Sequence, residues 1–296
     1  MTLPEIDHQF STEEKCRELL ERLRWPNGPE CPRCSTREVV RLSTNTNLLW
    51  CSKCDYQFGV TVGTVWHDSH LPLKVWFMAV LLLCEARKGM SANQIKRTLG
   101  ISYKTAWYLC HRIRAAMVES QQTKLNGIVE MDETYLGGRK KGITMSDAKA
   151  AKQIVLGIRQ RGGELRFFQA KDVTSRTLKQ FIDKNVSDEV EFFVTDEFPA
   201  YPWAIKGKLT EKHRQIRHKE TYVQGNVHTN TVESAFSLFK RAVTGSWHKI
   251  SRKHLAAYLR EMSFRFNRRD DDEIFVDTLR HMVTTPTLTF QQLTAV

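Results

Sequence analysis

Three acidic residues and one lysine have the types and spacing of a metal-dependent phosphoryl-transfer site. Asp132 and Asp196 each end an apolar run. A carboxylate that ends a buried strand lies at the edge of a sheet, where α/β domains hold their active sites. Glu233 begins a predicted helix, and Lys240 lies two turns further along the same helical face. Carboxylate oxygens are the ligands that hard divalent ions prefer, and two such ions can bracket the attacking and leaving oxygens of a phosphoryl group.

The residue types and spacing alone do not assign a role in metal binding to each of these four positions. A single carboxylate is more often a helix cap, a turn residue or a surface charge. Glu133 directly follows Asp132, and Glu197 directly follows Asp196. Either glutamate therefore competes with its neighbouring aspartate for the same role.

Four cysteines form two CxxC pairs, the pattern typical of a zinc ribbon. The pairs are Cys31 with Cys34 and Cys51 with Cys54, and sixteen residues separate them. A CxxC turn presents two sulfurs, and zinc takes four such ligands in a tetrahedron. Four thiolates leave no open coordination position, so we expect one structural Zn²⁺. The remaining cysteines are expected in the core: Cys16, Cys84 and Cys110.

Residues 91–118 are predicted to form a helix-turn-helix. Ser91, Gly100 and Ser102 are suited to a helix cap, a tight turn and a second cap. No acidic residue occurs between Glu85 and Glu119, whereas lysines and arginines recur there. A recognition helix needs such a positive, polar leading end, although an ordinary helical hairpin with a basic face fits the same pattern. The candidate DNA contacts on the second helix are Tyr103, Lys104, Thr105, Tyr108 and Arg112.

In the part of the chain that carries the carboxylates, the predicted strands come mostly before the predicted helices. The predicted strands cover residues 128–131, 153–158, 165–170 and 190–195. The predicted helices cover residues 176–185, 231–243, 252–267 and 272–282. This order predicts an α/β domain with a central sheet.

Composition indicates a folded, basic protein with a polyanionic partner. The chain has 296 residues, 41% of them hydrophobic, and a net charge of +12. This length allows two or three units with separate cores. A positive charge of this size favours polyanions through release of counterions from phosphates, but composition does not separate nucleic acid from an anionic membrane.

Neither a membrane span nor a secretion signal is expected. No stretch approaches the roughly 20 apolar residues that a bilayer requires. The N-terminal residues lack the basic and apolar regions of a signal peptide. We therefore expect a cytoplasmic protein, in which reduced cysteines bind metal instead of forming disulfides.

The layout resembles bacterial insertion-sequence transposases of the DDE type that carry an N-terminal zinc ribbon. The resemblance covers nearly the whole chain. Its segments here are CPRC, CSKC, MDETYLGG (131–138), VTDEFPAY (194–201) and HTNTVESAFSLFKR (228–241). It implies a multi-domain α/β protein: a zinc ribbon, a helix-turn-helix, then an RNase H-like α/β catalytic domain with C-terminal helices. The corresponding segments are 1–66 for the N-terminal helix and ribbon, 67–122 for the helix-turn-helix, 127–283 for the catalytic domain and 284–296 for a C-terminal tail.

The resemblance assigns Asp132 and Asp196 to the first two places of the acidic triad and leaves two alternatives for the third. The step from Glu233 to Lys240 matches the glutamate-to-lysine spacing of many DDE enzymes. Some relatives have an asparagine in the third place, which points to Asn230. We favour Glu233 because it is charged and shares a helix face with Lys240. Asn230 is then a helix cap or an auxiliary ligand.

Two basic stretches and one histidine are further candidates for DNA contact. The residues of the two stretches are Arg139, Lys140, Lys141, Arg214 and Arg217. Both stretches also fit solvated loops. His228 either contacts the scissile phosphate or has a structural role.

The resemblance implies a transposase that cuts DNA at the ends of an insertion sequence and joins the ends to target DNA. Its cofactors would be one structural Zn²⁺ and two catalytic Mg²⁺ or Mn²⁺, the latter bound by Asp132, Asp196 and Glu233. Its partner would be double-stranded DNA in the bacterial nucleoid, and pairing of two ends implies a homodimer or larger assembly. The alternatives are a DNA-binding regulator and a catalytically inactive transposase remnant. A glycosidase with paired carboxylates fits a basic chain with a zinc ribbon poorly.

Overall fold

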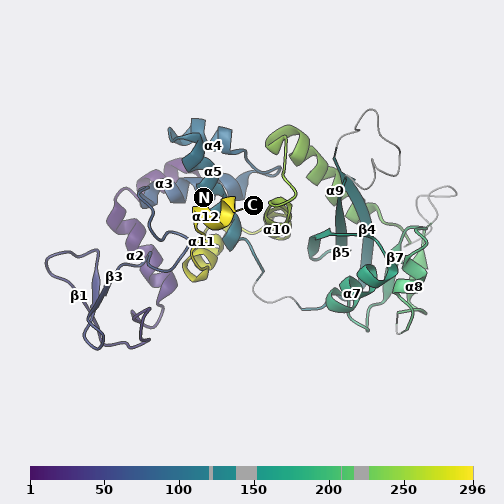
Figure 1. Cartoon of the computed structure of the whole chain (residues 1–296), viewed down its shortest axis with the longest axis horizontal. Coiled ribbons are helices and arrows are strands. Elements are labelled where there is room, and N and C mark those ends of the chain that lie inside the picture. Colours follow the sequence, from purple (N-terminus) through teal and green to yellow (C-terminus); the bar gives the residue numbers. More distant parts are fainter. Residues whose placement is uncertain (120–122, 138–151, 208, 217–226, 296) are drawn as a thin grey trace. The chain divides into compact units, whose positions relative to one another are not determined.

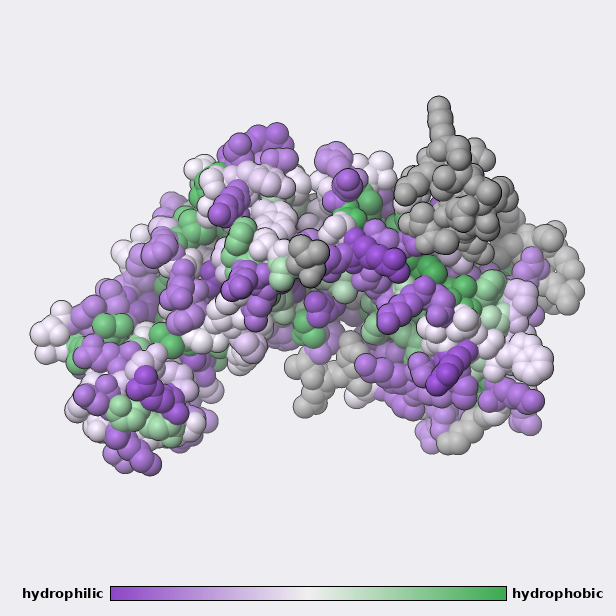
Figure 2. Space-filling view, in the orientation of Figure 1, coloured by the Kyte–Doolittle hydropathy of each residue, from purple (hydrophilic) through white to green (hydrophobic). Residues whose placement is uncertain are grey.

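A computed structural model of the chain (Figure 1) describes residues 1–119, 123–137, 152–207, 209–216 and 227–295. They form two compact units, Met1–Val118 with Arg268–Val296 and Glu119–Asn267. Hydrophilic residues cover most of the described surface on the face in Figure 2, and hydrophobic residues form only small patches there. Among the described residues, the structure has no helix whose length and apolar character would let it cross a bilayer.

The first unit begins with two short helices and a small antiparallel sheet. Helices α1 (Leu3–Gln9) and α2 (Glu13–Arg24) each start after a threonine that caps the helix with its side chain. The sheet has the order β1-β2-β3. Its strands are β1 (Val39–Arg41), β2 (Leu49–Cys51) and β3 (Tyr56–Phe58). Buried Leu49 and Phe58 pack with the four cysteines of the CxxC pairs, so the predicted ribbon is present.

A helical core completes the first unit. Its helices are α3 (Leu73–Glu85), α4 (Ala92–Leu99), α5 (Tyr103–Ala116), α11 (Ile274–Thr284) and α12 (Phe290–Thr294). The three cysteines expected in the core, Cys16, Cys84 and Cys110, are buried here.

Helix α11 belongs to the first unit, although the sequence predicts residues 127–283 as one catalytic segment. It packs against α2 and α3, and the Phe275 ring lies 5.8 Å from that of Phe77, centroid to centroid. The Cys84 thiol of α3 lies 3.3 Å from the Thr278 hydroxyl. The division differs from the prediction because the apolar face of α11 is buried by helices that lie far away in sequence.

Helices α4 and α5 form the predicted helix, turn and second helix. The Ser91 and Ser102 hydroxyls accept hydrogen bonds from the backbone of Gln94 (3.2 Å) and Thr105 (3.1 Å). Between the helices, Gly100 has a φ of 67°, a left-handed conformation that favours glycine. Local capping and turn chemistry therefore explain this motif.

The second unit contains a mixed sheet in the order β6-β5-β4-β7-β8 (Figure 1). The strands are β4 (Ile128–Leu136), β5 (Gln153–Gln160), β6 (Leu165–Ala170), β7 (Phe192–Thr195) and β8 (His213–Gln215). Strands β4, β5 and β6 pair antiparallel, whereas β7 runs parallel to both β4 and β8.

Helices cover both faces of this sheet. They are α7 (Ser175–Asn185), α8 (Tyr201–Ala204), α9 (Asn230–Ala242), the π-helix η1 (Val243–Trp247) and α10 (Leu255–Asn267). Met131 and Leu156 pack in a cluster with α7 and α8, and Val155 packs with α9 and α10. Neighbouring Val155 and Leu156 enter different clusters because successive strand residues point to opposite faces. The predicted α/β class is confirmed, with a mixed sheet that helices cover on both faces.

Candidate active site and zinc site

Two parallel strands bring Asp132 and Asp196 to the same edge of the sheet. Strands β4 and β7 pair with Glu130 opposite Val194. Each aspartate lies two residues beyond that pair, Asp132 within β4, which continues to Leu136, and Asp196 directly after β7, so the two acids lie next to each other. Ligand oxygens of Asp132, Glu133 and Asp196 all lie within 4.8 Å of one another. Glu133 thus joins the two aspartates, whereas the other competing glutamate, Glu197, is exposed and outside this group.

Helix α9 adds Glu233 and Lys240 to this edge. An open cavity of about 730 Å³ contains both residues and the acidic cluster. The described residues that line it are Asp132, Glu133, Thr134, Asp196, Glu233, Phe236, Ser237, Lys240, Arg241 and Thr244. Asn230, the first residue of α9, is exposed and lies outside this lining. Of the two alternatives for the third acidic place, only Glu233 faces the cavity.

Burial and the neighbouring carboxylates disfavour the charged form of Asp132. Burial, and then the carboxylates of Glu133 and Asp196, raise the pKa of Asp132 from 3.8 to about 8. A hydrogen bond of 2.7 Å from the Glu133 backbone to Asp132 Oδ1 opposes this shift. Such a site favours a bound cation, because a cation would offset the repulsion between carboxylates.

Neighbouring residues orient the acidic side chains. The Tyr201 hydroxyl donates a 2.9 Å hydrogen bond to Glu133 Oε2. The backbone N–H of Phe198 donates to Asp196 Oδ1 at 3.1 Å. Sequence reasoning missed the role of Tyr201. Its only signal was its place in the segment VTDEFPAY, which follows the second strand.

The carboxylate cluster fits hard divalent ions. Asp132, Glu133 and Asp196 offer only oxygen ligands, which Mg²⁺ and Mn²⁺ accept. Glu233 lines the same cavity and adds a further carboxylate. These residues would hold such ions, and Lys240 and Arg241 contribute positive charge at the cavity wall.

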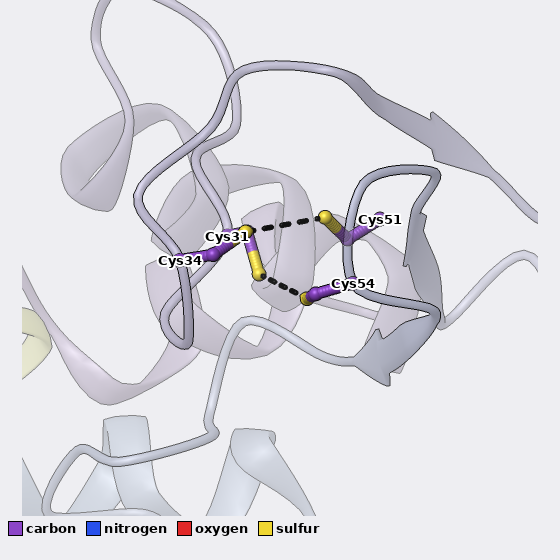
Figure 3. Close-up of side chains that lie close together, drawn as sticks. All are labelled: Cys31, Cys34, Cys51 and Cys54. Carbon is purple, nitrogen blue, oxygen red and sulfur yellow. Dashed lines mark hydrogen bonds between the residues drawn. The ribbon is translucent and has the colours of Figure 1, made fainter.

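The four ribbon cysteines converge as a zinc site requires (Figure 3). The Sγ atoms of Cys31 and Cys54 lie 3.6 Å apart, as do those of Cys34 and Cys51. Sulfurs about 2.3 Å from a tetrahedral zinc ion would be roughly 3.8 Å apart. The donor set and its spacing therefore fit one structural Zn²⁺.

The two halves of the zinc site share a backbone feature. The residue after the second cysteine of each CxxC pair is left-handed, with φ of 55° at Ser35 and 53° at Asp55. Only a few per cent of residues other than glycine adopt this conformation. It turns the chain back at each pair, so both pairs present their sulfurs to the same point.

Only part of the predicted DNA-contact set is available on α5. Tyr103 is 49% exposed, and Lys104 is exposed beside it. The Thr105 hydroxyl lies 2.7 Å from that of Ser102, at the helix cap. The Tyr108 hydroxyl donates to the backbone oxygen of Leu288 at 2.6 Å, so it is engaged by the C-terminal segment.

The prediction that Arg112 lies on the surface is wrong. Its exposed fraction is 3%. Its guanidinium donates to the His67 backbone oxygen and lies over the rings of Trp76 and Tyr108, 5.2 Å and 5.0 Å from their centroids. Arg112 therefore packs inside the first unit and is not available on its surface.

The two basic stretches give limited support for DNA contact. Arg214 is half-buried on β8, where it donates to the backbone oxygen of Glu211 at 2.7 Å and lies over the Phe192 ring. The other predicted residues of these stretches, Arg139, Lys140, Lys141 and Arg217, lie outside the described residues.

Comparison with known proteins gives matches over both units. Residues 124–267 match the ISXO2-like transposase domain, and residues 11–57 match the transposase zinc-ribbon domain. The chain is 28% identical, over 274 residues, to an uncharacterized protein in transposable element ISH50 of Halobacterium salinarum, and the match covers 86% of this chain and 91% of that protein. Among solved structures, the Mos1 strand transfer complex matches 70% of this chain and 74% of its own, with 13% identity and a TM-score of 0.31.

Proposed function

Because the chain belongs to the transposases that combine a transposase zinc ribbon with an ISXO2-like transposase domain, we propose that it cuts DNA at the ends of an insertion sequence and joins those ends to target DNA. One observation carries the proposal. Asp132 and Asp196 from neighbouring parallel strands share a cavity with Glu233 and Lys240 from α9. Families of this kind use such a constellation for chemistry on phosphates, and the basic chain suits a DNA substrate.

The acidic residues are proposed to hold two divalent ions, Mg²⁺ or Mn²⁺. When bound by Asp132, Asp196 and Glu233, such ions supply activation of the attacking oxygen and neutralisation of charge on the phosphoryl group. Glu133, oriented by Tyr201, is a further ligand candidate. Lys240 is proposed to bind a DNA phosphate beside the reacting one, since it lines the cavity.

Two successive displacements at phosphorus account for the proposed reaction. In the first, a water oxygen bonds to phosphorus while the bond to the 3′-oxygen breaks, leaving a 3′-hydroxyl and a 5′-phosphate. In the second, this 3′-hydroxyl attacks a phosphodiester of the target, and the target's own 3′-oxygen leaves with a proton. The number of phosphodiester bonds is unchanged in the second step. The protein forms no covalent bond to DNA, so its contribution is positioning and electrostatic stabilisation.

Recognition of the element ends is proposed for the first unit. The ribbon and the leading end of α5, with exposed Tyr103 and Lys104, would contact the DNA. Joining two ends to one target requires two active sites, so a homodimer or larger assembly is proposed on DNA.

Cleavage and joining assays on DNA that carries the element's own ends test this function. We expect the wild type to nick and join the ends with Mg²⁺ or Mn²⁺. Asp132→Asn, Asp196→Asn and Glu233→Gln should lose both reactions by at least about a hundredfold while still binding the ends. Asn230→Ala is the matched control from the same helix and should stay active.

Three outcomes would change the proposal. An active Glu233→Gln with an inactive Asn230→Ala would move the third ligand to Asn230. A wild type that binds the ends but never cuts them with either metal would favour the regulator or the inactive remnant. If the wild type does not bind the ends at all, both the transposase and the DNA-binding regulator would be contradicted.

A further inference from the structure

Glu130 is a fully buried carboxylate in the strand that carries Asp132. Its exposed fraction is 0%, and it lies two residues before Asp132 on β4. It is outside the cavity lining, so it does not face the proposed substrate. A buried carboxylate costs free energy unless its partners satisfy it, and Glu130 has partners on both oxygens.

One oxygen of Glu130 caps the start of α9. Glu130 Oε2 accepts hydrogen bonds from the Thr231 N–H at 2.9 Å, the Thr231 hydroxyl at 2.7 Å and the Val232 N–H at 3.1 Å. The first N–H groups of a helix have no partner within the helix, and a negative charge is favoured there. A strand residue 101 positions earlier in the sequence therefore does the work of a helix cap.

The helix has no side-chain cap from its own N-cap residue. Thr229 occupies that position and makes no capping hydrogen bond. Its hydroxyl instead donates to Glu233 Oε1 at 2.5 Å. At the start of α9, Thr231 and Val232 are therefore bound to Glu130, and Thr229 is bound to Glu233, the proposed third metal ligand.

The second oxygen of Glu130 is held by the turn that follows β5 and by the segment before α9. Arg161 Nε donates to Glu130 Oε1 at 2.6 Å, and its Nη2 donates to the His228 backbone oxygen at 3.0 Å. His228 Nδ1 lies 3.3 Å from the same Glu130 oxygen. Arg159 adds a 2.9 Å hydrogen bond to the Thr231 backbone oxygen. Of the two alternatives for His228, these contacts favour the structural role.

We infer that Glu130 is a positioning residue for the third acidic ligand. By clamping the first turn of α9 to β4, it sets the place of Glu233 relative to Asp132 on the same strand. The inference rests on the proposed function, because it assumes that Asp132 and Glu233 serve the same metal site. A displacement of a catalytic group by about 1 Å can lower the reaction rate about a hundredfold. Glu130 can therefore affect the rate of cleavage strongly without contacting DNA.

Glu130→Gln is the main test, because glutamine keeps the size and removes the charge. Its amide would present donors to groups that already donate, so the Thr231 and Val232 contacts should weaken. We expect faster hydrogen exchange at these two amides and Mn²⁺ binding to the DNA-free protein that is weaker by about tenfold or more. The Mg²⁺ concentration for half-maximal cleavage should rise in parallel, while affinity for end DNA stays within about twofold.

Glu261→Gln is the matched control. Glu261 is also 0% exposed, and it pairs with buried Arg265 at 3.2 Å on α10. Its loss should lower thermal stability but leave Mn²⁺ affinity and the exchange of the α9 amides unchanged. If Glu130→Gln fails to fold, Thr231→Val removes only the hydroxyl donor and should weaken Mn²⁺ binding by about two- to fivefold.

The outcomes separate this inference from the proposed function. If Glu130→Gln or Thr231→Val exposes the α9 amides but binds Mn²⁺ like the wild type, Glu130 only stabilises the fold and the inference is overturned. The same holds if Glu261→Gln weakens Mn²⁺ binding equally, or if the wild type binds no Mn²⁺. A wild type that binds Mn²⁺ but cuts no DNA would contradict the proposed function, and the exchange and Mn²⁺ measurements would still decide the role of Glu130.

Discussion

The hydroxyl of Tyr201 donates a 2.9 Å hydrogen bond to Glu133 Oε2, joining α8 to the acidic residues of β4. Tyr201 is completely buried. Burial, and then the charge of Glu133 and Asp132, raise the pKa of Tyr201 well above its usual value. The phenol therefore stays protonated and acts as a permanent donor to Glu133.

Replacing Tyr201 with phenylalanine tests this contact. Tyr201→Phe keeps the ring and removes the donor, so Glu133 loses the partner that orients it. We expect a loss of about 1.5–3 kcal/mol in the free energy of unfolding, the range for hydrogen bonds to charged groups, and weaker Mn²⁺ binding. Chemical denaturation and calorimetry would measure both. Tyr103→Phe, at an exposed tyrosine, is the control, and equal behaviour of the two variants would show that the contact has no role.

The raised pKa of Asp132 predicts a stability that falls with rising pH. Asp132 titrates near pH 8 in the folded chain, against 3.8 as its ordinary value. Between these values the folded chain binds more protons than the unfolded chain, so unfolding becomes easier as pH rises, by at most about 1.4 kcal/mol per pH unit. Without divalent metal, melting temperature should fall more steeply in the wild type than in Asp132→Asn between about pH 5 and about pH 8. Added Mg²⁺ should reduce the difference, and identical slopes would refute the assignment.

Gly157 allows α9 to approach the sheet beside Asp132. It lies opposite Asp132 on β5, and a Cβ there would come within 2.5 Å of the Phe236 ring and 3.0 Å of the Phe167 ring. Gly157→Ala should displace α9 and cost about 1–3 kcal/mol in the free energy of unfolding, with loss of cleavage. Gly245→Ala has nothing within 4 Å and should be neutral. Combining Gly157→Ala with Phe236→Leu should restore part of the stability; no rescue would mean that the strain lies elsewhere.

The cysteine cluster predicts one zinc ion per chain. Cys51→Ala should lose the metal, because three thiolates no longer close the tetrahedron, and should unfold the ribbon and lower affinity for end DNA. Elemental analysis and a mobility-shift assay would measure these effects. Cys110→Ala removes a buried cysteine outside the cluster and should retain the zinc. A full equivalent of zinc in Cys51→Ala would rule out this ligand set.

Lys104 and Arg112 should behave in opposite ways, although both lie on α5. Lys104→Ala should weaken DNA binding and reduce the slope of log affinity against log salt by about 1, with little change in stability. Arg112→Ala removes buried contacts and should destabilise the first unit by about 1–3 kcal/mol. Salt titrations and thermal melts would compare them. If Arg112→Ala changed the salt dependence of DNA binding without changing stability, Arg112 would be a DNA contact after all.

Short-range sequence patterns were sufficient to predict those helix and strand boundaries that depend on neighbouring residues. The strand predicted over residues 165–170 has the same bounds as β6, and the caps at Ser91 and Ser102 are in place. Other bounds extend beyond the prediction. Strand β4 continues to Leu136, past the predicted end at 131, because pairing with β5 supports residues whose own pattern is not strictly apolar.

By itself, the sequence determined the features that depend on neighbouring residues. The CxxC spacing determined the four zinc ligands, and the apolar runs determined that Asp132 and Asp196 directly follow buried strand residues, although β4 continues past Asp132. Tertiary structure alone decided that Glu233 faces the cavity and Asn230 does not, that Arg112 is buried, and that Glu130 caps a helix 101 residues away. The physical reason is that hydrogen bonding and burial are satisfied by whichever groups the fold brings together, and spacing along the chain does not record those partners.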